Sequence, residues 1–228
     1  MQKESMMKAP HFVFLSGLSG SGKGYFFDNI MPAGIFHKFV QMTTRARRPN
    51  EVDGKDYWFV DEKTFEQEPR ATTLWVNERF WQPGEPKWLY GVPASEFERH
   101  RGENLAYDVI EPKYIRQMMN WTESHGLRYQ FRILHFLPPK ENFETAAARA
   151  NMTNDMKVRH TNTCDLADFW RAGLTPDFTL MSSADEVFLP CRMIRYFDSL
   201  FRWRERCRIP QGAHKKRIGD ELFLVKSR

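Results

Sequence analysis

The chain has 228 residues and a formal net charge of +5, and 41% of its residues are apolar and 28% charged. This composition is typical of a soluble globular protein with one core, or one core with insertions. It contains no apolar run near the length of about 18 residues that crosses a membrane, and residues 1–10 lack the apolar stretch of a secretory signal. We therefore expect a cytoplasmic protein without a membrane partner.

The cysteines and the positive charge restrict the chemistry further. The three cysteines, Cys164, Cys191 and Cys207, are widely spaced and form no C-x-x-C pair, which favours a reducing compartment over a metal framework. Basic residues concentrate in residues 202–217, where few aromatic residues lie between them. This pattern disfavours nucleic acid as a partner, whereas the positive charge suits small substrates that carry several phosphates.

The first predicted strand, residues 12–16, leads directly into a glycine-rich loop. Gly17, Gly22 and Lys23 fit G-x-x-x-x-G-K, the loop that wraps nucleotide phosphates. Glycines let the backbone N–H groups approach phosphate oxygens, the following helix presents its N-terminus to the anion, and the lysine adds a positive charge. The predicted ATP-binding residues are Gly17, Ser19, Gly20, Ser21, Gly22, Lys23 and Gly24.

Gly24 departs from the usual form of this loop. A serine or threonine normally follows the lysine, and its hydroxyl contacts Mg²⁺. Because Mg²⁺ commonly keeps several water ligands, Ser21 or a water molecule could replace that hydroxyl. We expect ATP and Mg²⁺ to be used.

Further elements follow in an alternating order. A helix is predicted over residues 23–30, short strands over 39–44 and 56–60, a helix over 62–68, and strands with a loop or hairpin over 72–91. The later elements are a helix over 93–101, a strand over 104–110, a helix over 112–125, a strand over 129–136, a polar helical stretch over 141–173, a strand over 177–181 and a closing helix over 185–206.

Strands separated by helices predict an α/β fold, a parallel sheet sandwiched by helices, in which ligands bind at the carboxyl ends of the strands. We expect a P-loop α/β sandwich with an inserted substrate-binding lobe. The expected division is a core of residues 1–38 and 96–206, an inserted lobe of 39–95 and a basic tail of 207–228.

A second group of residues with the chemistry of anion binding lies in residues 43–60. Three arginines stand within four positions beside Pro49, followed by a turn and Tyr57. Guanidinium groups bind phosphate through two hydrogen bonds, and a phenol adds another without charge. An arginine cluster is often only a solvated surface, but a phosphoryl-transfer enzyme needs a second anion site beside its glycine loop.

Here the chain resembles the guanylate kinase family, whose nucleoside-monophosphate signature is T-T-R-x-x-R-P-x-E-V-x-G-x-D-Y-x-F. The resemblance extends to Leu89-Tyr90-Gly91 and to Tyr107-Asp108-Val109, and covers about residues 10–200. It implies a P-loop kinase fold, in which the inserted lobe of residues 39–95 is a mixed-β lobe that binds the acceptor and residues 141–173 form a helical lid. It also implies a kinase that transfers the γ-phosphoryl group of ATP to GMP or dGMP.

The resemblance also implies roles for individual residues. Arg45 and Arg48 would clamp the acceptor phosphate, with Tyr57 and Tyr90 donating hydrogen bonds to it. Asp108 would lie near the acceptor and bind the metal indirectly, through water. Lys23 would bind the ATP phosphates, and Arg149 and Arg159 are the candidates for lid arginines. The expected catalytic set is therefore Lys23, Arg45, Arg48, Arg149 and Arg159.

The positions that read guanine in the family differ in this chain. They are occupied by Gln41, Leu74 and Val92, although Glu78 could substitute if the loop register shifts. Gln41 is included among the expected acceptor-binding residues. Two other hypotheses therefore stay open: a kinase of the same fold for another nucleoside monophosphate or a ribose-bisphosphate-type sugar phosphate, and a non-catalytic binding module. The sequence does not reveal the oligomeric state.

Overall fold

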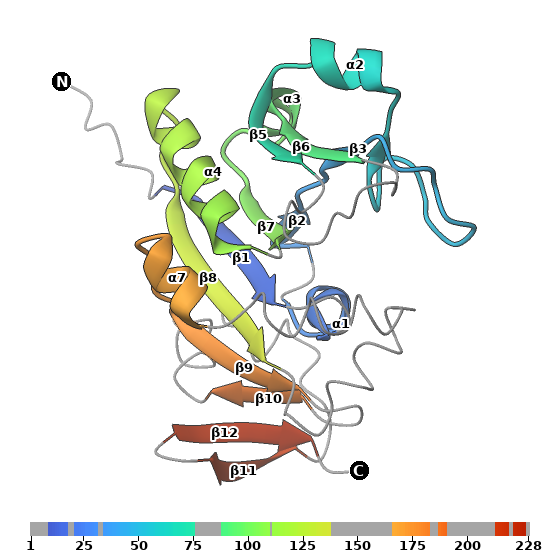
Figure 1. Ribbon diagram of the computed structural model, residues 1–228. Coiled ribbons are helices and arrows are strands. Elements are labelled where there is room, and N and C mark those ends of the chain that lie inside the picture. Colours follow the sequence, from blue (N-terminus) through green and yellow to red (C-terminus); the bar gives the residue numbers. More distant parts are fainter. Residues whose placement is uncertain are drawn as a thin grey trace, which may run out of the picture.

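The computed structural model describes residues 9–17, 21–31, 34–75, 88–109, 111–137, 166–182, 187–190, 213–218 and 221–226. These residues form two β-sheets with helices around the larger one (Figure 1). The larger sheet has eight strands in the order β11-β12-β10-β9-β8-β1-β7-β2. Its strands are β1 (His11–Gly17), β2 (Phe36–Lys38), β7 (Asn104–Val109), β8 (Gln130–Leu137), β9 (Phe178–Ser182), β10 (Val187–Pro190), β11 (Ala213–Ile218) and β12 (Glu221–Lys226).

The centre of the larger sheet is parallel. Strands β2, β7, β1, β8 and β9 pair with one another in parallel, and β1 lies between β7 and β8. A parallel strand is covered on both faces, which explains why β1 reads as a nearly continuous apolar run and is buried along its whole length. The predicted α/β fold with a parallel sheet is confirmed.

Helices cover both faces of this sheet, as the alternation of side chains along β1 requires. Val13 and Leu15 pack on the face that contacts α1 (Lys23–Asn29). Phe12 and Phe14 point to the other face, which is covered by α3 (Ala94–Arg99), α4 (Pro112–Ser124) and α7 (Leu166–Arg171).

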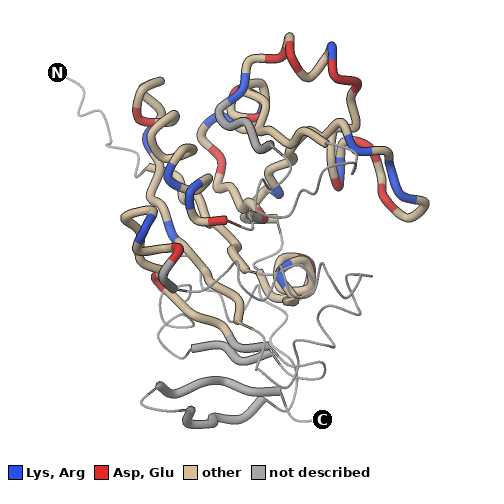
Figure 2. Tube along the Cα trace, viewed as in Figure 1, with Lys and Arg blue, Asp and Glu red and all other residues tan. Residues whose placement is uncertain are grey.

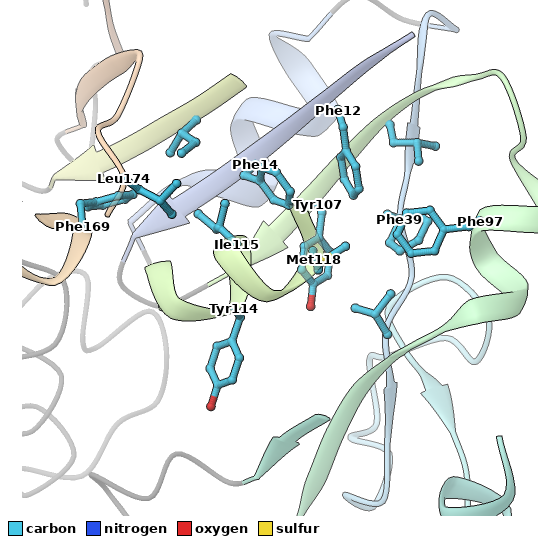
Figure 3. Packing of buried hydrophobic residues seen from close by; sticks show 13 residues of the cluster. Phe12, Phe14, Phe39, Phe97, Tyr107, Tyr114, Ile115, Met118, Phe169 and Leu174 are labelled. Carbon is cyan, nitrogen blue, oxygen red and sulfur yellow. The ribbon is translucent and has the colours of Figure 1, made fainter. Parts of the chain in front are cut away.

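The second of these two cores is rich in aromatic side chains (Figure 3). The rings of Phe12 and Phe14 stack with a centroid distance of 4.6 Å, and the ring centroids of Phe97 in α3 and Phe39 lie 4.7 Å apart. Ile115 and Met118 of α4 are fully buried against the same cluster. This core holds the ends of β1 and β7 in place, and both strands lead to the candidate site.

The smaller sheet is mixed and has the order β4-β3-β6-β5. β3 pairs with β4 in parallel, and the other neighbours are antiparallel. With α2 it lies beyond the β2 edge of the larger sheet, at the upper right of Figure 1, within the range 39–95 predicted for the inserted lobe. Its elements are β3 (Met42–Thr43), β4 (Trp58–Phe59), α2 (Glu62–Gln67), β5 (Arg70–Trp75) and β6 (Leu89–Pro93).

The predicted strand over residues 39–44 is divided between the two sheets. The backbone N–H of Phe39 donates a hydrogen bond to the carbonyl of Ala106 in β7, and the Trp58 N–H donates to the Gln41 carbonyl. The chain therefore leaves the larger sheet after residue 39 and enters the smaller one by residue 41, a change of partner that strand propensity does not encode.

The C-terminal region differs from the sequence prediction. A closing helix over residues 185–206 is wrong for residues 187–190, which form β10 and pair with β9 and β12; residues 183–186 and 191–206 lie outside the described part. Residues 207–228, expected as a basic tail, contain β11 and β12. These strands pair with each other, and β12 also pairs with β10, so they extend the sheet by non-local hydrogen bonds.

The predicted helical lid over 141–173 lies largely outside the described residues, as do Arg149 and Arg159. Its described end, α7, packs against α4 through the fully buried Phe169. In the parts of the chain that the structure describes, every helix is too short or too polar to cross a membrane.

Candidate active site

The glycine loop begins where β1 ends and closes where α1 begins. Gly17 has a φ of 141°, and a Cβ at this position would lie 2.5 Å from the carbonyl oxygen of Phe136 in β8. Gly22 caps α1 with a φ of 95°. Both positions therefore require glycine, one for close approach and one for the left-handed turn. Ser19 and Gly20, between them, lie outside the described residues.

Lys23 stands at the first position of α1 with its side chain almost fully buried. Its Nζ donates a hydrogen bond to the Gly17 carbonyl at 2.8 Å and lies 3.5 Å from a carboxylate oxygen of Asp108. The ammonium is thus held between the end of β1 and Asp108. The structure brings together Lys23 and Asp108, two residues predicted from separate motifs.

Asp108 has the donor chemistry that a magnesium site needs. It follows Tyr107 in β7, next to β1, and 45% of its side chain is exposed. Mg²⁺ prefers carboxylate oxygens and retained waters, so a hydrated ion fits this exposed carboxylate beside the loop. Gly24 adds no ligand, but its position is exposed and an added Cβ would meet nothing within 4 Å.

Arg45 lies at the end of β3 and is held rigidly by its neighbours. Its guanidinium donates to Glu51 Oε1 at 2.6 Å and to the Ala46 carbonyl at 2.8 Å. It also lies 5.3 Å from the ring centre of Tyr57. Burial acts to lower its pKa, but the hydrogen bond from Arg45 to Glu51 and the influence of Tyr90 outweigh burial and raise it. The group therefore stays charged inside a largely buried site.

Glu51 is a site residue whose role the sequence reasoning missed. One carboxylate oxygen accepts from Arg45, and the other accepts from the backbone N–H of Arg48 at 2.8 Å. Burial acts to raise the pKa of Glu51, but these hydrogen bonds lower it. Its place in the signature, six residues after Arg45, was the available signal. In Figure 2, the segment between β3 and β4, which contains Arg45 and Glu51, carries closely spaced basic and acidic positions.

Two tyrosines complete the site. The rings of Tyr57 and Tyr90 lie 5.8 Å apart in an edge-to-face arrangement, although 33 positions separate them in the chain. Burial, together with Tyr90 and the charge of Asp108, raises the pKa of Tyr57 far above its ordinary value. Tyr57 is therefore a neutral hydroxyl donor at physiological pH. Asp108 interacts electrostatically both with Tyr57 and with Lys23.

The three positions that correspond to the guanine-reading residues of the family, Gln41, Leu74 and Val92, differ in their surroundings. The Oε1 of Gln41 accepts a hydrogen bond from the Tyr107 hydroxyl at 3.1 Å, and Val92 is fully buried. Leu74 lies in β5 opposite Tyr90 in the register of the small sheet. Arg48, by contrast, has an exposed side chain. The structure thus groups Lys23 with Asp108, and Arg45 with both tyrosines. Gln41 contacts Tyr107.

Comparisons with known proteins agree with the signature. The guanylate kinase family model matches residues 9–77, a shorter range than the expected 10–200. The guanylate kinase of Thermus thermophilus is 37% identical over 98 residues, which is 42% of this chain and 42% of that protein. The guanylate kinase of Zymomonas mobilis is 34% identical over 128 residues, 55% of this chain and 54% of that protein.

A crystal structure of guanylate kinase from Anaplasma phagocytophilum is similar with a TM-score of 0.48 and 18% identity, over 87% of this chain and 86% of that one. The chain spans about half the length, or less, of the curated relatives above. Over residues 9–77, the sequence of this chain is similar to the guanylate kinase family, and the curated relatives agree over part of their length.

Proposed function

We propose that this protein transfers the γ-phosphoryl group of ATP to a nucleoside monophosphate, with GMP or dGMP as the leading acceptor. The observation that carries the proposal is the pairing of two anion sites: Lys23 with Asp108 at the glycine loop, and Arg45 with Tyr57 beside them. A phosphoryl-transfer enzyme needs one such site for each substrate. Relatives named guanylate kinase support it over part of their length.

On the donor side, the glycine loop and Lys23 would bind the phosphates of ATP. Lys23 Nζ now contacts the Gly17 carbonyl, and a bound phosphate oxygen would offer it a stronger, charged acceptor. The loop N–H groups and the N-terminus of α1 would surround the β-phosphate. Mg²⁺ would neutralise phosphate charge, held through water by Asp108.

On the acceptor side, residues 39–95 would serve as the acceptor lobe. Arg45 is already oriented by Glu51, while the exposed Arg48 can turn toward an anion. The hydroxyls of Tyr57 and Tyr90 would donate to the same phosphate. An oxygen of the acceptor phosphate attacks the γ-phosphorus, the bond to ADP breaks, and the site contributes mainly alignment and charge neutralisation.

A coupled assay of ATP consumption with GMP tests this proposal. We expect turnover by the natural chain and a loss of kcat of at least about a hundredfold in Lys23→Met, because the lysine acts on charge that develops during transfer. Absence of turnover in both proteins with every acceptor would refute the kinase proposal and leave the non-catalytic binding module.

A specific observation favours a second candidate, a kinase for another phosphorylated acceptor. Val92 offers no polar group, and Gln41 is engaged with Tyr107. A site without polar partners for a base discriminates poorly among bases. Calorimetric titration with GMP, dGMP, AMP, CMP, UMP and a ribose bisphosphate distinguishes the candidates: a clear preference for GMP supports the first, and equal weak binding of all bases rejects it.

The acceptor clamp gives a first kinetic prediction. Arg48→Ala should raise the acceptor KM about tenfold and also lower kcat, because the guanidinium would both bind the phosphate and align it. Steady-state kinetics with varied acceptor measures both parameters. An unchanged kcat/KM would contradict the role, and Lys55→Ala, a nearby exposed cation outside the predicted clamp, is the control.

A further inference from the structure

Two histidines and a glutamate gather at the point where the two sheets are connected. His37 lies in β2, His100 follows the last residue of α3, and Glu103 precedes β7. β2 and β7 are parallel neighbours, with His37 opposite Leu105. His37 therefore lies in the larger sheet just before one connection to the smaller sheet, and His100 and Glu103 lie on the other connection.

Their polar atoms are close together. His100 Nδ1 lies 2.8 Å from Glu103 Oε2, and His37 Nε2 lies 3.4 Å from the same oxygen. The imidazole rings are stacked with their centres 5.2 Å apart. One ligand atom from each of the three side chains falls within 4.8 Å of the others.

This donor set suits a divalent transition metal better than Mg²⁺. Two imidazoles, one carboxylate and one water make a common zinc coordination, in which bonds of about 2.0–2.2 Å hold the ligand atoms about 3.3 Å apart. The exposed fractions of His37, His100 and Glu103 are 45%, 21% and 43%, so small side-chain rotations can reach this spacing and leave room for water. An adjoining pocket of about 410 Å³ provides access.

A buried carboxylate supports one of the histidines. Glu96 is only 1% exposed, and its Oε2 lies 3.9 Å from His100 Nε2. Its position is maintained by hydrogen bonds from the Val40 N–H and the Trp58 indole. A carboxylate hydrogen-bonded to the second nitrogen of a metal-bound histidine orients the ring and strengthens the ligand. Glu96 lies at ion-pair distance from Nε2, beyond hydrogen-bond distance, and leaves Nδ1 of His100 for the metal.

The nearby cations are already balanced. Arg99 pairs with Glu96, and Lys38 Nζ lies 3.9 Å from Asp56. Their charges therefore oppose a bound cation less than isolated cations would.

We propose that His37, His100 and Glu103 form a binding site for a divalent transition metal such as Zn²⁺, with water as the fourth ligand. A metal bound here would tie β2 to the segment between α3 and β7. The site is independent of the proposed kinase reaction and of its Mg²⁺.

Zinc titration of the full chain after treatment with a chelator tests the site. Competition with a chromophoric zinc indicator measures affinity for the metal alone, and thermal unfolding with and without zinc gives a second measurement. We expect saturable zinc binding that weakens at least about tenfold in His37→Gln and in His100→Gln. Zinc should raise the Tm of the natural chain more than that of either variant, and Mg²⁺ should have no such effect.

His125→Gln is the matched control, because this exposed histidine lies at the end of α4, stacked on Trp121 with ring centres 3.9 Å apart. It should retain the zinc affinity and the zinc-dependent Tm of the natural chain. Binding of zinc by cysteine thiolates elsewhere in the chain would be unchanged in His37→Gln. Unchanged affinity in that variant, or no saturable binding by the natural chain, overturns the proposal.

Discussion

At the scale of single residues, Glu51 links the two arginines of the candidate acceptor site. It accepts the side chain of Arg45 and the backbone of Arg48 through different oxygens, and Arg45 is largely buried. Removing the carboxylate charge would leave a buried guanidinium with a weaker partner, which costs more free energy than the loss of an exposed ion pair.

Glu51→Gln should lower the free energy of unfolding at pH 7 by about 1–2 kcal/mol and raise the acceptor KM. The effect on stability depends on pH. Since the folded pKa of Glu51 lies below its ordinary value of 4.5, the charged pair stabilises the fold above that pH and loses its contribution as the pH falls through the lowered pKa. Chemical denaturation at pH 7 and near pH 3 should therefore show a difference between variant and natural chain that shrinks in acid.

A constant difference across that range, or no difference at pH 7, would contradict this role of Glu51. Glu66→Gln, an exposed carboxylate in α2, is the control and should change stability little at either pH.

Gly24 permits a test of the missing hydroxyl. Because nothing lies within 4 Å of the Cβ that a substitution would add, Gly24→Thr should fold with unchanged stability. If Mg²⁺ serves the proposed reaction, the new hydroxyl should lower the Mg²⁺ concentration needed for half-maximal kcat, by about two- to tenfold. Gly24→Ala supplies the Cβ without the hydroxyl, and an equal effect of both substitutions would reject this interpretation.

At the scale of elements, the junction of β1, β8 and the glycine loop depends on a close backbone contact. Gly17 lies opposite Phe136, so the loop starts from the strand pair at the centre of the sheet. Since β1 is hydrogen-bonded on both sides, this junction has little freedom to move away from an added atom.

Gly17→Ala should therefore destabilise the protein by about 2–4 kcal/mol and reduce ATP binding. Gly126→Ala is the matched control: its φ is also positive, at 68°, but an added Cβ would meet nothing within 4 Å. The control should cost only about 1 kcal/mol. Urea denaturation of both variants measures the excess cost at Gly17, where the approach to Phe136 and the φ of 141° act together. Equal losses would show that Gly17 is no more constrained than an ordinary left-handed glycine.

At the scale of the whole molecule, the last described strands belong to the main sheet. β12 pairs with β10 over Phe188↔Val225, Leu189↔Leu224 and Pro190↔Phe223, and β11 forms the edge. In Figure 1 they lie at the end of the sheet opposite β2. Lys215, Lys216 and Arg217 therefore lie on a strand that is paired with its neighbour.

Deletion of residues 211–228 should lower the Tm and promote association, because it would leave the edge of β10 unpaired. Size-exclusion chromatography and thermal unfolding measure these effects. Replacing Lys215, Lys216 and Arg217 by glutamine removes charge but keeps the strand, and should leave both properties close to those of the natural chain. A deletion variant with unchanged Tm and elution would show that the hairpin does not stabilise the sheet.

Much of the fold followed from local patterns. The apolar run of β1, the glycine loop and the amphipathic α4 each lie in one continuous stretch, so their sequence alone predicted their type and order. β10 was mistaken for part of a helix because its pairing with β9 and β12 is non-local and a short apolar run suits either state. Gly219-Asp220, between two strands of equal length, was an unused signal for a hairpin.

By itself, the sequence determined the α/β class and predicted two motifs for phosphate binding, because loop chemistry and strand periodicity depend on neighbours in the chain. Tertiary structure decided which residues of those motifs meet: Lys23 with Asp108, and Tyr57 with Tyr90. It also decided that Glu51 orients Arg45 and that the C-terminal residues extend the sheet. These outcomes depend on contacts between segments that are distant in the sequence, which form only when the chain folds.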